Sequence, residues 1–486
     1  MKQTALETYF DRFRKNIVGI DAEFETPFGR KQLIYTDWIA SGRLYKPIEE
    51  KLSNQLGPFL GNPHTDSNIS SSYTTEMYEE ARQIIKKHVN ANEEDVLIAA
   101  GYGMTAAINK LQRILGMRVN NYRYFSPNYK LKDKPVVFIT GMEHHSNQIS
   151  WLTTVADVVR INFDDNFEID HEDLEHKLER YKDRRLKIGS FTAASNVTGI
   201  KTDVHQLAEI MHRHGGYCFI DYAAGAPYLE INMHPDKETQ RLDAIFFSPH
   251  KFLGGPGSNG ILIMSKHLYH NMIPDNPGGG TVTWTNPWGG YRFFEDIELR
   301  EDGGTPGFMQ MIKAALAIRL KEEMGVKNIE KREQEIINYL FGNLSGIKGL
   351  NILLAGKRNR IGAISFNIDG IHYNLVTKVL NDKYGIQVRG GCACAGTYGH
   401  LLFNIGPQVS KQITEKIDEH DLSVKPGFVR LSIHPTTTAA EIDTVIEALK
   451  DIAANKEEYK KMYRYDKNKN EFYHKEFQLN HISLFE

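Results

Sequence analysis

Polar residues that could do acid–base, nucleophilic or phosphate chemistry follow five short apolar runs of the sequence. Each run has the length and composition of a buried strand, and helical patterns separate the runs, so the sequence predicts a mostly parallel α/β sheet. Ligands of open parallel sheets bind beyond the carboxyl ends of the strands. The expected site therefore contains the segments Gly101–Ala106, Glu143–Asn147, Ser195–Gly199, Asp221 and Ser248–Lys251.

The loop Gly101–Ala106 has the spacing G-x-G-x-x-A and opens a predicted helix. A glycine turn before a helix exposes backbone N–H groups and the positive end of the helix dipole to a phosphate. Nicotinamide-binding proteins share this spacing, but they also need an acidic residue at the end of the next strand. A basic loop, residues 120–134, occupies that place here. The loop therefore predicts a phosphate site, with a plain strand-to-helix turn as the alternative.

Two strand-end residues narrow the choice of phosphate ligand. Pyridoxal phosphate needs a lysine amine for its Schiff base and an acidic partner for its pyridine nitrogen. Lys251 lies between two apolar runs and beside Ser248 and His250, and Asp221 ends another run. A carboxylate at Asp221 would keep the ring nitrogen protonated and make the ring an electron sink. These residues predict a pyridoxal-phosphate enzyme.

The motifs EHHSN, SNVTG, SPHK, GGTP and RGGCAC, with the strand end at Asp221, occur in the order found in class V aminotransferases. From about Tyr35 to Ile452 the chain resembles this family of fold-type I pyridoxal-phosphate enzymes, and in particular its cysteine desulfurase and selenocysteine lyase-like branch. Its GCxC loop also resembles that of molybdenum cofactor sulfurases. The resemblance implies a large α/β domain, a small C-terminal α+β domain, an amino-acid substrate, a sulfur-acceptor protein and a homodimer.

The resemblance also implies the contacts of the cofactor. His144 would stack on the ring and relay protons, and Asn196 would hydrogen-bond the ring hydroxyl. Thr305 would reach the phosphate of the neighbouring subunit. The remaining cofactor-binding residues would be Gly103, Met104, Thr105, Asp221, Ser248, His250 and Lys251.

The sulfur chemistry is expected at Cys394, which falls on the desulfurase nucleophile in the pattern R-x-G-x-x-C that begins at Arg389. A thiolate on a mobile loop would attack the substrate sulfur and become a persulfide. By the same resemblance Arg430 would bind the substrate carboxylate, since a guanidinium does so bidentately, and Arg389 would assist. Cys392 lies two residues before Cys394. In an extended loop the two thiols would point the same way, and Cys392 could resolve the persulfide.

Other interpretations of the same residues stay open. Cys392, Cys394 and His400 could bind zinc, although C-x-C is not the common zinc spacing. Ala224 stands where desulfurases usually carry Gln, which leaves Asn196 to contact the ring hydroxyl. Alternative functions are a class V lyase, epimerase or aminotransferase that ignores Cys394, and a non-catalytic sulfur carrier or scaffold. Cys218 lies within an apolar run and is expected in the core.

The composition of the chain indicates which broad class of protein it belongs to. The chain has 486 residues, a formal net charge of -2 and 3 cysteines. An odd number of cysteines does not form a disulfide framework, and the sequence has no apolar run long enough to span a membrane. The near-neutral charge argues against nucleic-acid and membrane partners. We therefore expect a soluble cytoplasmic protein.

A change of pattern near residue 310 predicts the domain organisation. We expect an N-terminal arm over 1–34, a large cofactor-binding domain over 35–325, a small domain over 326–455 and an extension over 456–486. The basic insertion 118–134 is expected to be a solvated loop, with nucleic-acid contact as the alternative. Elements predicted beyond residue 310 are a helix over Ile312–Leu344 broken near Gly325, strands at Ile361–Ile368, Ile386–Arg389 and Phe428–Ile433, and a helix with a capping box at Thr438-x-x-Glu441.

Overall fold

The computed structural model describes residues 1–65, 67–118, 133–478 and 485. The basic insertion predicted at 118–134 lies almost entirely outside these residues. The chain forms two compact units. Unit 1 comprises Met1–Ala40, Asn196–Ile200 and Lys327–Glu486, and unit 2 comprises Ser41–Ser195 and Lys201–Val326.

These units differ from the four consecutive segments expected from the sequence, which stay a prediction about domains. Residues 35–40 and 196–200, predicted within the large domain, belong to unit 1. Residues 35–40 belong to unit 1 because the backbone around them pairs with strands of that unit. Ile34 N donates to Gly385 O at 2.9 Å, and Ser432 N donates to Thr36 O at 2.7 Å. The N-terminal segment is thus hydrogen-bonded to strands near the C-terminus.

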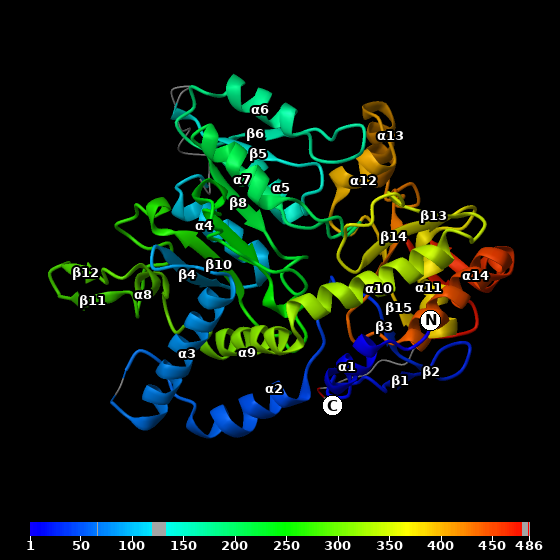
Figure 1. Ribbon diagram of the computed structural model, residues 1–486, viewed down its shortest axis with the longest axis horizontal. Helices are drawn as coiled ribbons and strands as arrows, with labels where there is room; N and C mark the ends of the chain where they lie inside the picture. The colour runs from blue at the N-terminus through cyan, green and yellow to red at the C-terminus, as the bar shows by residue number, and fades with distance from the viewer. Residues whose placement is uncertain (66, 119–132, 479–484, 486) are drawn as a thin grey trace. The chain divides into compact units, whose positions relative to one another are not determined.

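Unit 2 contains a seven-stranded sheet in the order β4–β10–β9–β8–β7–β5–β6 (Figure 1). Strands β9, β8, β7, β5 and β6 pair in parallel, and β10 is antiparallel to both of its neighbours. The prediction of a mostly parallel α/β sheet is confirmed. The five apolar runs that precede the predicted site segments form β4, β5, β7, β8 and β9. The strands of this sheet are β4 Asp95–Ala100, β5 Val136–Ile139, β6 Asp157–Arg160, β7 Lys187–Thr192, β8 Tyr217–Asp221, β9 Ala244–Phe247 and β10 Gly260–Ser265.

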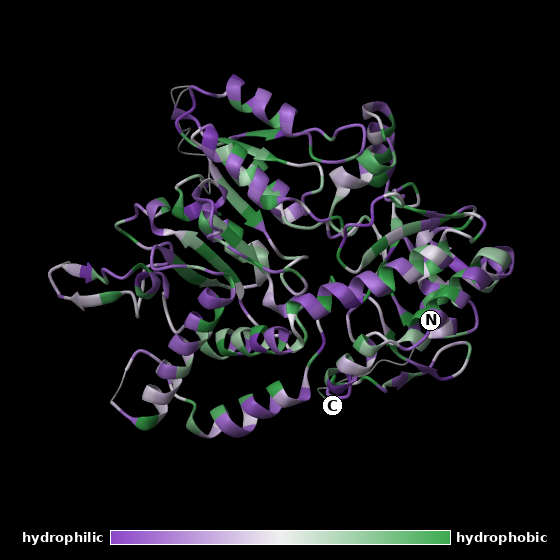
Figure 2. Ribbon diagram, in the orientation of Figure 1, coloured by the Kyte–Doolittle hydropathy of each residue, from purple (hydrophilic) through white to green (hydrophobic). Residues whose placement is uncertain are grey.

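The central strands are apolar because helices cover the sheet. Every residue of β7 and β9 is buried, which is typical of parallel strands covered on both faces. Figure 2 shows these central strands mainly in the hydrophobic colour. Trp151 of α5 and Leu111 of α4 join one apolar cluster with Phe219 of β8 and Phe246 of β9.

The helices of unit 2 begin and end at signals that the sequence carries. Asp203 caps α7, where its Oδ1 accepts a hydrogen bond from Gln206 N at 3.1 Å. A hairpin of β11 Val282–Thr285 and β12 Tyr291–Phe293 forms within residues 276–300, a segment rich in Gly and Trp. The helices are α2 Lys46–Lys51, α3 Ile69–His88, α4 Gly103–Ile114, α5 His145–Leu152, α6 His171–Arg180, α7 Val204–Arg213, α8 Ile297–Glu301 and α9 Phe308–Met324.

Unit 1 contains a four-stranded sheet in the order β13–β14–β17–β16. The run predicted as one strand at 386–389 is two strands, and that prediction is corrected. Ile386–Gln387 pairs in parallel with β3, whereas Arg389–Gly391 pairs antiparallel with β17. The strands are β1 Glu23–Phe24, β2 Lys31–Gln32, β3 Ile34–Tyr35, β13 Leu350–Ile352, β14 Ala363–Ile368, β15 Ile386–Gln387, β16 Arg389–Gly391, β17 Phe428–Ser432, β18 Tyr463–Asp466 and β19 Glu471–His474.

The helices beyond residue 310 follow the predicted signals. Gly325, at φ +76°, separates α9 from α10, and the capping box of Thr438 and Glu441 opens α14. In the C-terminal extension α14 continues past a non-helical residue, Asn455, and a β18–β19 hairpin follows. Among the described residues, no helix is long and apolar enough to cross a membrane. The helices of unit 1 are α1 Ala5–Arg14, α10 Val326–Leu344, α11 Tyr373–Tyr384, α12 Gly396–Leu402, α13 Pro407–Asp418 and α14 Ala439–Met462.

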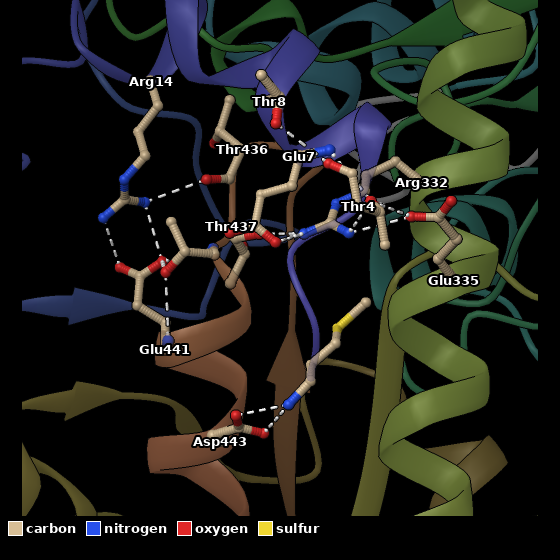
Figure 3. Close-up of polar contacts among 12 residues, drawn as sticks. Thr4, Glu7, Thr8, Arg14, Arg332, Glu335, Thr436, Thr437, Glu441 and Asp443 are labelled. Carbon is tan, nitrogen blue, oxygen red and sulfur yellow. Dashed lines mark hydrogen bonds and ion pairs between the residues drawn. The ribbon is translucent and has the colours of Figure 1, made fainter.

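Buried charges attach the N-terminal helix α1 to unit 1 (Figure 3). Arg332 of α10 is 0% exposed, and its guanidinium contacts Glu7 at 2.9 Å and Glu335 at 3.1 Å. It also donates to the carbonyl of Thr437 at 3.1 Å. A guanidinium this deeply buried is tolerated only when it is paired. Helix α1 therefore supplies part of the charge balance of the core of unit 1.

We predict that Arg332→Ala lowers the free energy of unfolding by about 3 kcal/mol, because the carboxylate of Glu7, which is only 12% exposed, loses its counter-ion. Urea unfolding followed by circular dichroism measures this change. Lys416→Ala removes an exposed pair with Glu419 on α13 (2.7 Å) and serves as the control. Because an exposed ion pair contributes little to stability, this control should unfold close to wild type. Equal losses in the two variants would contradict the assignment.

Candidate active site

The carboxyl ends of five parallel strands lie along one edge of the sheet in unit 2. In spatial order these are β4, β9, β8, β7 and β5, with only the antiparallel β10 between the first two. The predicted convergence of strand ends is thus present in the topology. Nine of the predicted site residues are in unit 2, namely Gly103, Met104, Thr105, His144, Asp221, Ser248, His250, Lys251 and Thr305; the other four, Asn196, Arg389, Cys394 and Arg430, are in unit 1.

The glycine loop opens helix α4 at the end of β4. Gly103 has φ +61°, a conformation that side chains disfavour, and a Cβ added there would lie 2.8 Å from His250 Cε1 and 2.9 Å from Ser248 Oγ. Met104 N donates to Ser248 Oγ at 2.8 Å, so the hydroxyl joins the two loops. Thr105 Oγ1 lies 2.7 Å from Ser146 Oγ. The loop therefore brings backbone N–H groups and hydroxyls together at a helix N-terminus.

A cavity of about 860 Å³ lies beside this loop, and its walls include Gly103, His250 and Thr305 of the same chain. Ser258 Oγ and Asn259 Oδ1, on residues that also line the cavity, are buried without a hydrogen-bond partner among the described residues. Buried polar atoms normally have partners. These two atoms are therefore available to a polar ligand.

Asp221 ends β8 and is fully buried. Burial raises its pKa to about 6, although a hydrogen bond from Ala223 N at 2.8 Å and the charge of Lys251 act in the opposite direction. Lys251 is half-buried in the turn Pro249–Lys251 that follows β9. Burial and the same lysine lower the pKa of His250 to about 4, so this imidazole is neutral at pH 7. The amine of Lys251 thus acts electrostatically on both the carboxyl group of Asp221 and the neutral imidazole of His250.

Glu143, which the sequence analysis quoted but assigned no role, is buried beneath the strand ends. Its carboxyl group accepts hydrogen bonds from Thr140 Oγ1 (2.6 Å), Asn147 Nδ2 (2.6 Å) and Thr192 N (3.2 Å). Burial nevertheless raises its pKa to about 8, and the charge of Asp221 contributes to this rise. Its position at the end of β5, inside the EHHSN motif, was the signal that could have identified it. Glu143 ties β5, α5 and β7 together.

His144 and Thr305 are both held by the elements around them. His144 caps α5, where its Nδ1 accepts from Ser146 N at 3.1 Å. Thr305 is exposed in the loop that follows Glu301 and Asp302, and both of these carboxylates form ion pairs. Glu301 pairs with Lys110 at 2.9 Å, and Asp302 pairs with Arg82 at 2.8 Å. Ring stacking by His144 and contact of Thr305 with a neighbouring subunit stay predictions.

In unit 1, Arg430 of β17 is buried and paired. Its Nη2 donates to Asp37 Oδ1 at 2.6 Å, and its Nη1 donates to the carbonyl of Asn196 at 3.0 Å. Burial lowers the pKa of Arg430, and Asp37 opposes that shift. Arg389 of β16 lies opposite Arg430 and donates to Asp37 Oδ2 at 3.1 Å. Asp37 was not predicted as a site residue, although it follows the short apolar run Ile34–Tyr35 as a strand-end residue would.

Asn196 lies between Arg430 and the cysteine loop. Its Nδ2 donates to Ala393 O at 2.6 Å, and its Oδ1 is buried without a partner among the described residues. Two contacts hold its segment in unit 1. Arg360 Nη1 donates to Thr198 O at 3.0 Å, and Ser365 Oγ donates to Val197 O at 2.7 Å.

The cysteine loop is a strained turn. Ala393 (φ +47°) and Cys394 (φ +58°) both adopt left-handed conformations, which are uncommon for side-chain-bearing residues. The loop is therefore not extended. The strand-like alternation that would make Cys392 and Cys394 point the same way does not apply here. Cys394 is exposed and Cys392 half-buried. Cys218 is buried with its pKa raised well above the usual value by burial, which confirms it as a core thiol.

The zinc interpretation finds no support in the described part of the chain. There, no group of three or more His, Cys, Asp and Glu side chains is placed to hold a metal ion. Both ring nitrogens of His400 are within hydrogen-bond distance of other atoms, Gly396 O at 2.8 Å and Ser410 Oγ at 3.0 Å.

Comparison with known proteins places this arrangement in a family. The model of the family "Aminotransferase class-V" matches residues 34–445. The chain belongs to the class V aminotransferase family. A probable cysteine desulfurase from Halalkalibacterium halodurans is 30% identical over 367 residues, 75% of this chain and 84% of the relative. A probable cysteine desulfurase from Staphylococcus aureus is 30% identical over 370 residues, again 75% and 84%.

Solved structures show the same fold as this class V chain. The apo cysteine desulfurase of Thermococcus onnurineus has a TM-score of 0.72 and 24% identity, covering 94% of this chain and 99% of that one. A cysteine desulfurase from Escherichia coli has a TM-score of 0.69 and 21% identity, covering 91% and 98%. The predicted fold-type I architecture is confirmed.

Enzymes of this family use pyridoxal 5′-phosphate, and the residues of unit 2 fit that cofactor. Lys251 offers an amine, Asp221 a carboxyl group and the start of α4 a phosphate site. The polar atoms of Ser258 and Asn259, which have no partner among the described residues, and the close packing of His250 and Ser248 against Gly103 add to this fit. The chain is therefore a pyridoxal-phosphate enzyme.

We predict that Gly103→Ala weakens pyridoxal phosphate binding at least about tenfold, because the new methyl group would collide with His250 and Ser248. Titration of the apoenzyme, followed by cofactor absorbance, measures the dissociation constant. Gly116→Ala is a matched control, since Gly116 also has a positive φ (+66°) but nothing within 4 Å of the added Cβ. Both substitutions strain the backbone. An equal effect on cofactor affinity would show that the cradle at Gly103 is not the phosphate site.

Proposed function

We propose that this chain is a cysteine desulfurase, which transfers sulfur from cysteine, or selenium from selenocysteine, to Cys394 and releases alanine. One observation carries the proposal: the exposed Cys394 lies in a strained turn that Asn196 ties to the buried Arg430. Strained side-chain-bearing residues concentrate at functional sites. The two relatives at 30% identity, both named as probable cysteine desulfurases, support the same activity.

The residues of unit 2 are assigned the work at the substrate Cα. Bound pyridoxal phosphate supplies an electron sink for that carbon. Lys251 is the attachment point of the cofactor and the base that takes the Cα proton. Asp221, as a carboxylate, holds a proton on the ring nitrogen, and His144 covers the ring. The start of α4 binds the phosphate with Ser248 and His250.

The residues of unit 1 are assigned to the substrate carboxylate and its sulfur. Arg430 binds the carboxylate, assisted by Arg389, because guanidinium and carboxylate match in charge and shape. The thiolate of Cys394 attacks the substrate sulfur. The carbon–sulfur bond breaks with its electron pair on Cβ, which takes up a proton. Lys251 returns a proton to Cα, and the product is alanine. The sulfur stays on Cys394 as a persulfide, so thiol plus cysteine becomes persulfide plus alanine.

The persulfide needs an acceptor, and we assign that role to a sulfur-acceptor protein. The exposure of Cys394 allows such a transfer. We place the enzyme in the cytoplasm, since its three cysteines are all free thiols and a reducing compartment keeps them so.

We also propose a homodimer in which Thr305 completes the partner's phosphate site. The hairpin β11–β12, which precedes Thr305, exposes Trp284 (55%), Trp288 (88%) and Tyr291 (59%). Exposed aromatic side chains of this size are typical of surfaces that another protein covers.

The sulfur-transfer step is tested at the two loop cysteines. We predict that Cys394→Ser abolishes sulfide and alanine release while cofactor absorbance stays unchanged, because the cofactor site does not use the thiol. Cys392→Ser should retain most of the activity. Mass spectrometry of wild type after incubation with cysteine should find the added sulfur on Cys394.

Lys251→Ala is the contrasting variant in the same assays, and it should lose both turnover and the borohydride-stable attachment of the cofactor. Full desulfurase activity in Cys394→Ser, or a persulfide confined to Cys392, would contradict the assignment. Unchanged activity in both cysteine variants would favour a class V lyase or aminotransferase.

The shared site is tested by mixing subunits. Thr305→Ala and Lys251→Ala homodimers should each be impaired, Thr305→Ala by about tenfold through the loss of a hydrogen bond to phosphate. Co-expressed hybrids should regain activity, because one of their two sites then combines Lys251 from one chain with Thr305 from the other. Hybrids without added activity, or an active monomer in sedimentation, would contradict the proposal.

A further inference from the structure

Asp37 bridges two arginines that face each other across neighbouring strands. Arg389 of β16 and Arg430 of β17 are register partners in the antiparallel ladder. Two like charges in this position repel each other. One carboxylate oxygen of Asp37 lies 2.6 Å from Arg430 Nη2, and the other lies 3.1 Å from Arg389 Nη2. The three groups together carry a net charge of one positive unit.

Asp37 is held firmly in this position. Residue 37 forms a parallel bridge to Ser432, and Ile39 N donates to Ser432 Oγ at 3.1 Å. The neighbouring Trp38 stacks on the buried His434 with ring centroids 4.1 Å apart and an angle of 20° between the planes. The side chain of Asp37 is 13% exposed, against 47% for Arg389 and 3% for Arg430. The carboxylate is therefore a fixed charge within the sheet of unit 1.

We propose that Asp37 is a specificity-determining positioning residue, which restricts the enzyme to amino acids whose only carboxylate is the α-carboxylate. This inference rests on the proposed function, in which Arg430 binds that carboxylate. With Asp37 present, one net positive charge faces one substrate carboxylate. A second carboxylate on the substrate side chain finds Arg389 already paired and meets the negative charge of Asp37. Repulsion of the wrong ligand is a general source of specificity.

The fixed charge also acts on Arg430 itself. Arg430 Nε is buried without a partner among the described residues, so this N–H group can still donate a hydrogen bond. Its Nη1 is committed to Asn196 O and its Nη2 to Asp37. Asp37 thus fixes the plane in which Arg430 can meet a carboxylate, which is the work of a positioning residue.

The test measures binding to the holoenzyme without turnover. Dissociation constants of L-alanine, which has one carboxylate, and L-aspartate, which has a second one on its side chain, are determined by calorimetry. Wild type should bind alanine more tightly. In Asp37→Asn the ratio of the aspartate constant to the alanine constant should fall about tenfold, because a freed Arg389 gains a charge-assisted hydrogen bond to the second carboxylate. Asp37→Glu should keep the wild-type ratio.

Two further variants make the result specific to the arginine pair. In the double variant Asp37→Asn/Arg389→Gln the ratio should return to that of wild type, since the freed cation is gone. Asp418→Asn changes the net charge equally on the exposed helix α13 and should leave the ratio unchanged. An unchanged ratio in Asp37→Asn that retains cofactor absorbance would overturn the proposal.

Arg389→Gln alone tests the same idea if Asp37→Asn does not fold. It removes the net positive charge of the set, so alanine affinity should fall about tenfold, and an unchanged affinity would overturn the proposal. The assay of cysteine for alanine and sulfide is separate from these titrations. A wild-type enzyme that releases neither product would refute the proposed function, whereas the binding ratios decide the role of Asp37.

Discussion

Burying the guanidinium of Arg430 without a counter-ion would cost several kcal/mol, and its ion pair with Asp37 offsets that cost. Much of unit 1 depends on this pair. It holds the N-terminal segment 34–39 between the strands β15 and β17, which places these residues with the C-terminal half of the chain. The same guanidinium holds the backbone of Asn196, whose side chain in turn holds the cysteine turn. One buried cation thus organises residues from four distant parts of the sequence.

Unit 2 uses buried charge differently. Asp221 and Glu143 are both buried beneath the strand ends, and burial raises the pKa of each. Parallel strands covered on both faces leave little water at their ends, so a carboxyl group there titrates closer to neutral pH than it would on a surface. The hydrogen bonds that Glu143 accepts from β5, α5 and β7 hold these elements in register around Asp221. A cationic ring nitrogen beside Asp221 would lower this pKa again.

Backbone strain marks the proposed reactive positions in both units. Gly103 takes a left-handed conformation without steric penalty because it lacks a Cβ. Ala393 and Cys394 take it with a side chain, at a cost of order 1–3 kcal/mol each. The contact of Asn196 with Ala393 O helps to maintain the strained turn. The first conformation lets His250 and Ser248 pack against the loop, and the second presents a thiol at the surface.

Local sequence patterns were enough to predict many strands, strand-end residues and helix caps of this protein. Buried strands are read from short apolar runs, and each run predicted in unit 2 forms a strand of the sheet. Lys251 and Asp221 were predictable because the topology of parallel sheets gathers strand ends at one edge. Caps such as Asp203 and Thr438 act within four residues, so the sequence shows them directly. The motif order was enough to indicate the family.

Tertiary structure alone decided the interactions between residues far apart in the chain. Asp37 and Arg430 are 393 positions apart, and no local pattern pairs them. The membership of segment 196–200 in unit 1 depends on Arg360 and Ser365, which hydrogen-bond its carbonyls across more than 160 positions. The left-handed turn at Cys394 also escaped prediction, because alanine and cysteine do not favour that conformation by themselves. Burial and pairing are properties of the folded surroundings, and a sequence shows them only where the partners are near neighbours.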